Sequence, residues 1–209
     1  MAYDLEEQEQ IATLKAWWKD YGHYLLGAVI AVSLTGAGWL GWRNWQAGQA
    51  QAASAQYEAL VRAAQGGELK AMREAGAALA ENYSGTVYAS LGALAAARTL
   101  FERGDLKGAR AQLQWVLERG ASDELKDLAR LRLAAVLLDE KGYDEALKLM
   151  EAKPAAPLEP QYQVMKGDLL LAKNQPAEAR AAYRAALDKA GGSEAFRASI
   201  QLRLDALGG

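Results

Sequence analysis

Three glycines near the N-terminus have the spacing of a dinucleotide-binding loop. Gly36, Gly38 and Gly41 in the stretch TGAGWLGW spell G-x-G-x-x-G, the pattern that lets a backbone approach a pyrophosphate closely. Glu58 follows at about the distance of the acidic residue that binds the ribose in such sites. That chemistry needs a strand before the loop and a second strand ending near the acid. The elements around the glycines therefore decide what the motif means.

Few other residues could carry out chemistry. The chain has one histidine, His23, and no cysteine, so thiolate metal sites and cysteine or histidine-dependent catalysis have almost nothing to use. Adjacent carboxylates such as Asp139 and Glu140 are expected to lie on solvent-exposed turns. Nothing near them would raise the pKa of one above that of the other, as a catalytic acid and base pair requires. We expect no enzyme activity, no cofactor and no metal. With 24 Lys and Arg against 26 Asp and Glu, we also expect no nucleic-acid partner.

The composition after residue 46 predicts an all-α domain. Only eight Val, Ile or Thr residues occur between residues 46 and 209, too few for a buried parallel sheet. The stretch that should hold the second strand of a dinucleotide fold, QAGQAQAASAQYEALVRAAQ, consists of helix-forming residues. We therefore reject the nucleotide-binding interpretation of the three glycines.

Residues 24–42 instead predict a transmembrane helix, which we extend to 24–45. These 19 residues carry no charge and would span about 28 Å as a helix, close to the thickness of a bilayer core. Aromatic residues gather at both ends, as at membrane interfaces. The acidic stretch 1–23 is too long and too negative for the start of a cleaved signal peptide, so we expect an uncleaved anchor.

Two properties of this span stay open at the sequence level. Lys15 and Lys19 precede it and Arg43 follows it, which favours a cytoplasmic N-terminus by a small margin. One face is small, with Gly27, Ala31, Thr35 and Gly38 at helical spacing. That face could pack against another membrane helix, or the small residues could simply face lipid.

The region beyond the span contains a repeat. The stretches ERGDLKGA (102–109), DEKGYDEA (139–146) and AKNQPAEA (172–179) each end on an alanine, at spacings of 37 and 33 residues. A period near 34, with a turn followed by a small residue in the second helix, is typical of tetratricopeptide repeats. We predict three degenerate repeats, one more helix ahead of them near residues 68–81 and a capping helix at 194–207. The prolines of 152–160 should shorten the middle repeat.

The third repeat makes a specific packing prediction. Gly167 lies 12 residues before Ala179, so we expect the two to face each other where the helices cross. A leucine at position 167 should overpack this crossing, and an alanine should be far milder, or even stabilising. Asp168 could be a groove-facing hydrogen-bond acceptor or a plain surface charge.

Repeats of this type expose a concave face lined by their first helices. The helical phase offers a set of candidate partner-binding residues on that face, although several must belong to the core, which is the favoured place for any single one: Leu91, Leu94, Arg98, Phe101, Leu128, Leu131, Leu138, Val164 and Leu171.

The whole pattern resembles the YfgM family, the ancillary subunit of the SecYEG translocon. The stretches that carry the resemblance are EEQEQIATLKAWWKDYG, GWRNWQAGQAQAASAQYEAL, NYSGTVYASLGALAAAR and MKGDLLLAKNQPAEARAAYRAAL. The resemblance implies a single-pass protein of the bacterial inner membrane. It divides the chain into a cytoplasmic tail (1–23), a transmembrane helix (24–45) and a periplasmic tetratricopeptide-like domain (46–209).

The same resemblance implies partners and leaves two functions open. The expected partners are the SecYEG translocon, the periplasmic chaperone PpiD, secretory polypeptides and the lipid of the inner membrane. The first function is that of an adaptor linking emerging secretory proteins to periplasmic chaperones. The alternative is a regulator of envelope stress signalling that acts through the cytoplasmic tail.

Overall fold

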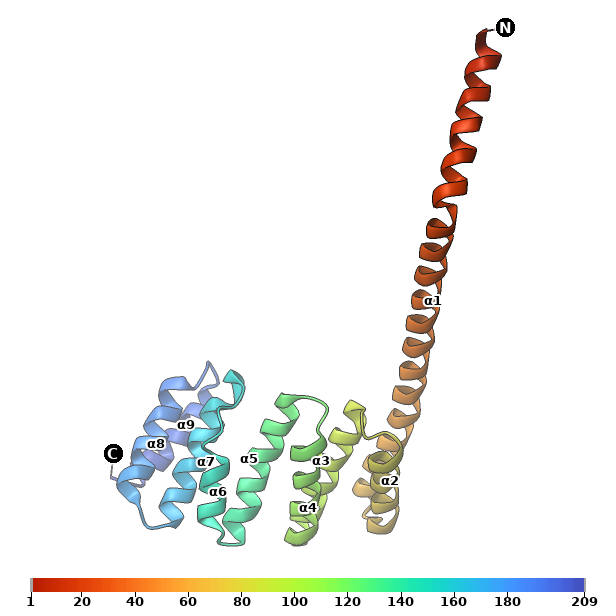
Figure 1. Cartoon of the computed structure of the whole chain (residues 1–209). Helices are drawn as coiled ribbons and strands as arrows, with labels where there is room; N and C mark the ends of the chain where they lie inside the picture. Colours follow the sequence, from red (N-terminus) through yellow and green to blue (C-terminus); the bar gives the residue numbers. More distant parts are fainter. Residues whose placement is uncertain (1, 209) are drawn as a thin grey trace. The chain divides into compact units, whose positions relative to one another are not determined.

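The computed structural model describes residues 2–208, with side chains from residue 9 onward, and in this range all regular structure is helical (Figure 1). This confirms the all-α prediction. The chain forms two units, Met1–Gly48 and Gln49–Gly209. The helices are α1 Ala2–Gly66, α2 Leu69–Asn82, α3 Val87–Glu102, α4 Leu106–Arg119, α5 Asp123–Asp139, α6 Tyr143–Leu149, α7 Glu159–Ala172, α8 Pro176–Lys189 and α9 Glu194–Asp205, with a 3-10 turn η1 at Ala156–Leu158.

The first unit consists of the N-terminal part of α1 and contains the predicted span without a break. Its large apolar side chains are exposed, as Val32 at 73% and Leu34 at 69% illustrate. The Thr35 hydroxyl donates to the Ala31 carbonyl at 2.8 Å, so this polar group is satisfied within the helix. Within residues 9–208, α1 is the one helix long and apolar enough to cross a membrane.

The glycine motif is therefore part of a helix. Gly36, Gly38 and Gly41 lie in the interior of α1, where neither a strand nor a loop precedes them. A dinucleotide site of the Rossmann type is excluded at this position. The acidic side chains at positions 4, 6 and 7 of the predicted cytoplasmic tail lie outside the described side chains.

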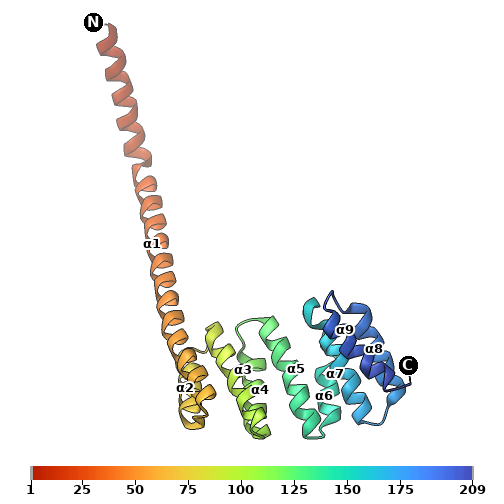
Figure 2. The ribbon, with the colours of Figure 1, turned by 180° about the vertical axis from the view of Figure 1, so that it is seen from behind.

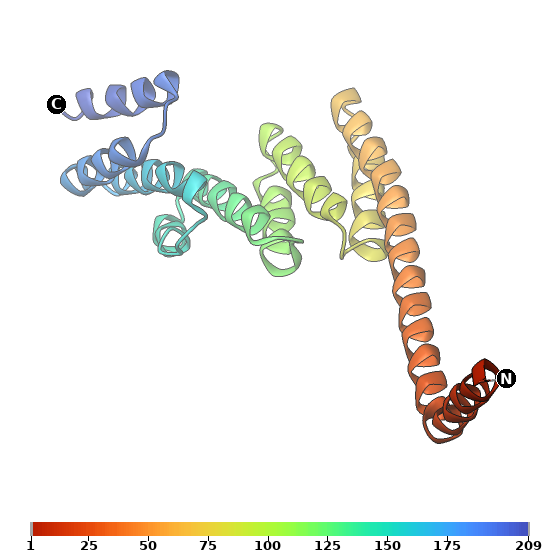
Figure 3. The same cartoon turned by 90° about the horizontal axis from the view of Figure 1, so that it is seen from above.

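The second unit is a row of helix pairs. The helices α3 and α4, α5 and α6, and α7 and α8 pack as pairs, and α4 on α5 and α6 on α7 join one pair to the next. Seen from above, α3, α5 and α7 follow one another, with α4 and α6 on the other side (Figure 3). The capping helix α9 packs on α8, as predicted (Figure 2). These three pairs are the predicted repeats.

The structure adds a fourth pair, at the N-terminal end of the repeat unit, that the sequence did not reveal. The end of α1 buries Ala53, Leu60 and Ala63, and α2 packs beside it and contacts α3. The predicted helix at 68–81 is therefore the second helix of a repeat whose first helix continues from the apolar segment.

One turn geometry joins the helices of all four pairs. Its central residue has a left-handed backbone, with φ of 76° at Gly67, 78° at Gly104, and 61° at both Lys141 and Asn174. The next amide donates to the carbonyl five residues earlier, which satisfies an otherwise free carbonyl at the end of the first helix. These bonds are Glu68 to Ala63 (2.8 Å), Asp105 to Leu100 (2.9 Å), Gly142 to Leu137 (2.8 Å) and Gln175 to Leu170 (2.9 Å).

The turn sets a constant spacing between buried residues of the two helices. A buried residue of the first helix and a buried residue 12 positions later in the second recur in every pair: Leu60 and Met72, Ala97 and Ala109, Ala134 and Ala146, Gly167 and Ala179. The fourth pair escaped sequence detection because it has large residues where the repeat pattern requires small ones.

In two of the pairs, a glycine on one helix leaves space for a large side chain on the other helix. In the last pair, a Cβ built on Gly167 would lie 2.4 Å from the Tyr183 ring, so glycine leaves the space that the ring fills. In the added N-terminal pair of α1 and α2, Gly76 occupies the position equivalent to Tyr183. A Cβ there would meet the Leu60 side chain at an ordinary contact distance of 3.6 Å. The Tyr183 ring is therefore the first obstacle to a larger residue at position 167, and an alanine there is not as mild as the sequence suggested.

Two aspartates hold the later helices together. The buried Asp127 carboxylate of α5 accepts from Arg130 at 2.5 Å and from the Ala155 amide at 2.8 Å, while its carbonyl accepts from the Tyr162 hydroxyl of α7. These bonds anchor the proline-rich loop that follows the short α6, the shortened repeat predicted from the prolines. Sequence reasoning missed Asp127 altogether.

Asp168 ties together the last three helices. Its carboxylate accepts from the Tyr183 hydroxyl of α8 at 2.6 Å and from Arg203 of α9 at 3.1 Å. Burial, and then the bond to Asp168, raise the pKa of Tyr183. Asp168 is thus a hydrogen-bond acceptor, as one sequence interpretation expected, but its partners belong to the chain itself, and the interpretation as a plain surface charge was wrong.

The helix crossings predict opposite effects for two glycine-to-alanine changes. Gly167→Ala should lower the free energy of unfolding by roughly 1–3 kcal/mol, because its Cβ overlaps the buried Tyr183 ring. Gly76→Ala is the matched control and should raise it by about 0.5–1 kcal/mol, because helix propensity improves without a clash. Urea unfolding of the full chain in detergent, followed by circular dichroism, measures both. Equal effects of the two variants would contradict the packing described.

The repeated turn predicts a graded series of substitutions. Lys141→Gly should stabilise the chain by about 1 kcal/mol, because a lysine pays a steric penalty in the left-handed region that glycine avoids. Asn174→Gly should gain less, because asparagine tolerates this conformation better. Gly104→Ala should lose stability although no atom lies within 4 Å of the added Cβ. The same unfolding assay ranks the variants. A stabilising effect of Gly104→Ala would contradict the left-handed backbone assigned to the central residue of the turn.

Candidate partner-binding cavity

The nine predicted partner-binding residues do not form one continuous surface. Leu94 is 3% exposed and belongs to the core, so its place among the candidates is corrected. Leu91 is half-buried on α3, and Leu171 of α7 is 43% exposed. The remaining apolar candidates are partly buried and pack against the cores: Phe101, Leu128, Leu131 and Leu138 on the main cluster and Val164 on the C-terminal one.

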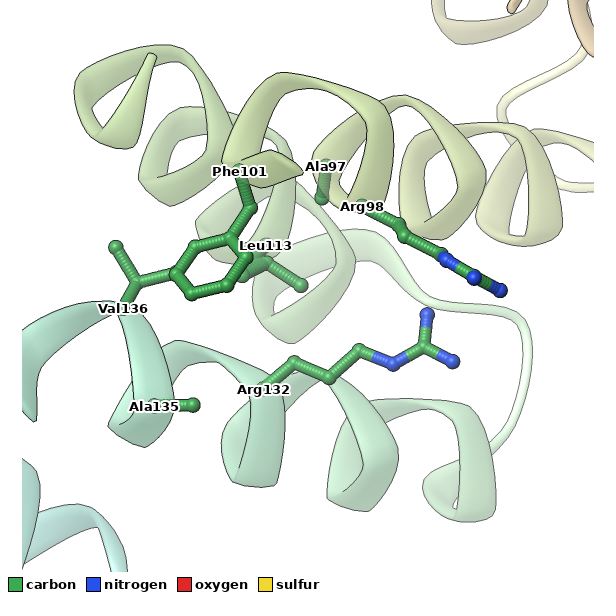
Figure 4. Close-up of a pocket in the computed structure, with 7 residues that line it drawn as sticks. All are labelled: Ala97, Arg98, Phe101, Leu113, Arg132, Ala135 and Val136. Carbon is green, nitrogen blue, oxygen red and sulfur yellow. The ribbon is translucent and has the colours of Figure 1, made fainter. Parts of the chain in front are cut away.

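Two of the nine candidates meet in a cavity between α3 and α5. Arg98 and Phe101 line it together with Ala97 of the same helix, and α4 contributes Leu113. The α5 side consists of Arg132, Ala135 and Val136, and the cavity volume is about 330 Å³ (Figure 4). The cavity lies between the first helices of two successive repeats.

The cavity has a cationic end and an apolar end. The guanidinium groups of Arg98 and Arg132 lie close together at one end, and the Phe101 ring lies beside Val136 and Leu113 at the other (Figure 4). Small residues, Ala97 and Ala135, leave room between the two ends.

The two arginines have different partners. The Arg98 Nε donates to the exposed Glu102 carboxylate at 2.8 Å, an ion pair that is open to solvent and therefore weak. Arg132 donates a long bond of 3.4 Å to the Leu94 carbonyl, and no carboxylate among residues 9–208 lies within 4.0 Å of it. Burial, and then the positive charge of Arg98, lower the pKa of the Arg132 guanidinium. It nevertheless stays charged, as arginine does in proteins.

Arg132 escaped the sequence prediction for a geometric reason. Equivalent positions of α3 and α5 were assigned to one face, which places Ala135 at the position of Arg98. The cavity is instead lined by the sides of two neighbouring helices that face each other, and Arg132 and Val136 on α5 are not the repeat equivalents of its residues on α3. Arg130 and Arg132 are the two charges within the otherwise apolar run LARLRLAAVLL, and charges in such a run were the signal that could have drawn attention to Arg132.

The chemistry of this arrangement suits the binding of a ligand. Guanidinium groups can donate hydrogen bonds to a carboxylate, and an apolar hollow beside them can cover an apolar group. Over the described side chains, no group of three or more His, Asp or Glu could hold a metal ion.

Comparison with known proteins agrees with this architecture. The profile of a family described as a tetratricopeptide repeat-like domain matches residues 15–209. A Neisseria gonorrhoeae protein named "Ancillary SecYEG translocon subunit" is 32% identical over 99% of this chain and 100% of its own length. Proteins of the same name from Haemophilus influenzae and Escherichia coli are 30% and 28% identical, over 97% and 96% of this chain and 98% and 96% of their own lengths.

The chain belongs to this family. The resemblance to the YfgM family that the sequence indicated is thereby confirmed. The matches extend over nearly the full length of both proteins, so they include the N-terminal region of this chain as well as its repeats.

Solved structures support the fold alone. The chain "MamA 41-end from Desulfovibrio magneticus RS-1" has a TM-score of 0.57 at 20% identity, covering 74% of this chain and 82% of its own. A double mutant of the same protein has a TM-score of 0.54, covering 74% and 93%.

Proposed function

We propose that this chain is a membrane-anchored ancillary subunit of the SecYEG translocon. The observation that carries the proposal is the coverage of the similarity, since relatives bearing this name align end to end with the chain. The anchor and the repeat domain would then act together, as one subunit beside the channel.

The proposed topology is a single pass through the bacterial inner membrane. Residues 1–23 lie in the cytoplasm, residues 24–45 span the lipid and residues 46–209 lie in the periplasm. Support comes from the exposed apolar surface of α1 and from Lys15 and Lys19, which outnumber Arg43 across the span.

In this position the repeat domain would link emerging secretory proteins to the periplasmic chaperone network, with a PpiD-type chaperone as partner. The cavity between α3 and α5 supports such a role, because helical repeat proteins bind their partners in the surface between successive repeats. A site of this size binds weakly, and the membrane anchor compensates by keeping it at high local concentration near the channel.

The topology can be tested in intact spheroplasts. Protease added outside should digest residues 46–209 and leave a protected fragment containing the tail and the span. A repeat domain that resists digestion until the membrane is breached would reverse the proposed orientation.

Site-specific crosslinking tests the binding face. A photo-crosslinking residue at Phe101, in the cavity, should capture a translocon component, a chaperone or a secretory chain in native membranes. The same residue at the exposed Lys148 of α6 is the matched control and should capture little.

Equal yields at the two positions would contradict binding in the cavity. A chain lacking residues 46–209 separates this role from the alternative one, regulation through the cytoplasmic tail. If that truncated chain keeps every partner, the adaptor function is wrong and the repeats act only as a spacer.

A further inference from the structure

We infer that the cavity between α3 and α5 binds a peptide segment in which a carboxylate side chain neighbours a large apolar side chain. The inference rests on the proposed function, because it states what a partner of the repeat domain must present at this site. Its support is the charge and shape of the cavity itself.

The apolar end defines one half of the ligand. Phe101, Leu113 and Val136 converge there, and the alanines beside them leave the space open (Figure 4). The volume of about 330 Å³ is near the lower limit of ligand-binding clefts. It suits a few side chains of a peptide segment better than a bulky ligand, and burying one large side chain there removes apolar surface from water.

The cationic end defines the other half. Arg132 is held in a partly buried position beside Arg98, and among residues 9–208 it has only a long bond to a backbone carbonyl and no carboxylate partner. An incoming carboxylate would relieve the repulsion between the two cations and accept charge-assisted hydrogen bonds from both. Glu102 already pairs with Arg98 from the exposed side, which leaves Arg132 as the principal donor.

The surroundings favour a peptide over other anions. A nucleic acid needs a row of cations along its backbone, whereas only two of the seven lining residues are charged and the formal net charge of the chain is −2. Inorganic phosphate would satisfy the arginines but leave the apolar end unfilled. A carboxylate beside an aromatic or aliphatic side chain satisfies both ends.

Peptide binding to the full chain in nanodiscs tests the inference. The probe is a short, end-blocked, fluorescent peptide with a glutamate next to a phenylalanine, and its partner probe has glutamine in place of the glutamate. We expect the glutamate peptide to bind about tenfold to a hundredfold more tightly, the range for hydrogen bonds to a charged group. Raised salt should narrow the difference.

Variants of the chain assign the effect to its residues. Arg132→Gln should abolish the preference for glutamate, Arg132→Lys should keep part of it, and Phe101→Ala should weaken both peptides. Arg184→Gln removes an exposed arginine of α8 that lies outside the cavity and should change neither affinity. Arg132→Gln also loses the bond to the Leu94 carbonyl, which could unfold the chain locally. In that case Arg98→Gln, at an exposed position, tests independently whether the preference for glutamate depends on the arginines.

Several results would overturn the inference. These are equal affinities for the two peptides, a preference that survives both arginine changes, and binding of neither peptide. Displacement of the glutamate peptide by nanodiscs rich in anionic phospholipid would instead assign the site to lipid. In each of these cases crosslinks at Phe101 in membranes could still form, so failure of the inference remains distinguishable from failure of the proposed function.

Discussion

The close crossing of two helices in each pair is the constraint on which the rest of the repeat unit depends. A residue with a left-handed backbone follows the first helix of every pair. The two buried residues at the crossing are then 12 positions apart along the chain. Interiors packed to this density tolerate little change in volume. The two helices therefore share a fixed amount of space, and one helix can be large only where the other is small. Leu60 with Gly76 and Gly167 with Tyr183 are two opposite solutions to that one requirement.

The regular crossing also explains why a binding cavity forms where it does. Successive first helices contact one another, so α3 and α5 lie at a distance set by the pairs to which they belong. Alanines on their facing sides, Ala97 and Ala135, do not fill that distance, and the space remains as the cavity. Arg98 and Arg132 then reach into it from opposite helices (Figure 4). The cavity is thus a consequence of repeat packing, with two charged side chains at one end.

The sequence predicted what depends on neighbouring residues along the chain. The uncharged span, the turns at Gly104, Lys141 and Asn174, and the proline-shortened repeat were all visible as local patterns. The sequence could not reveal contacts between residues about 30 positions apart, such as those of Asp127 with Ala155 and of Asp168 with Arg203. Arg132 was missed for the same reason, because its significance comes from facing α3. The pair of α1 and α2 was missed because it has large residues at the crossing, where the other pairs have small ones.

Hydrogen exchange of the full chain, alone and co-purified with the translocon, tests the central claim most directly. The claim is that the repeat domain binds its partners through the cavity between α3 and α5. It predicts added protection of amides in α3 and α5 when partners are present, with little change in α6 and α8. Added protection confined to residues 1–48, or spread evenly over all four helix pairs, would contradict it.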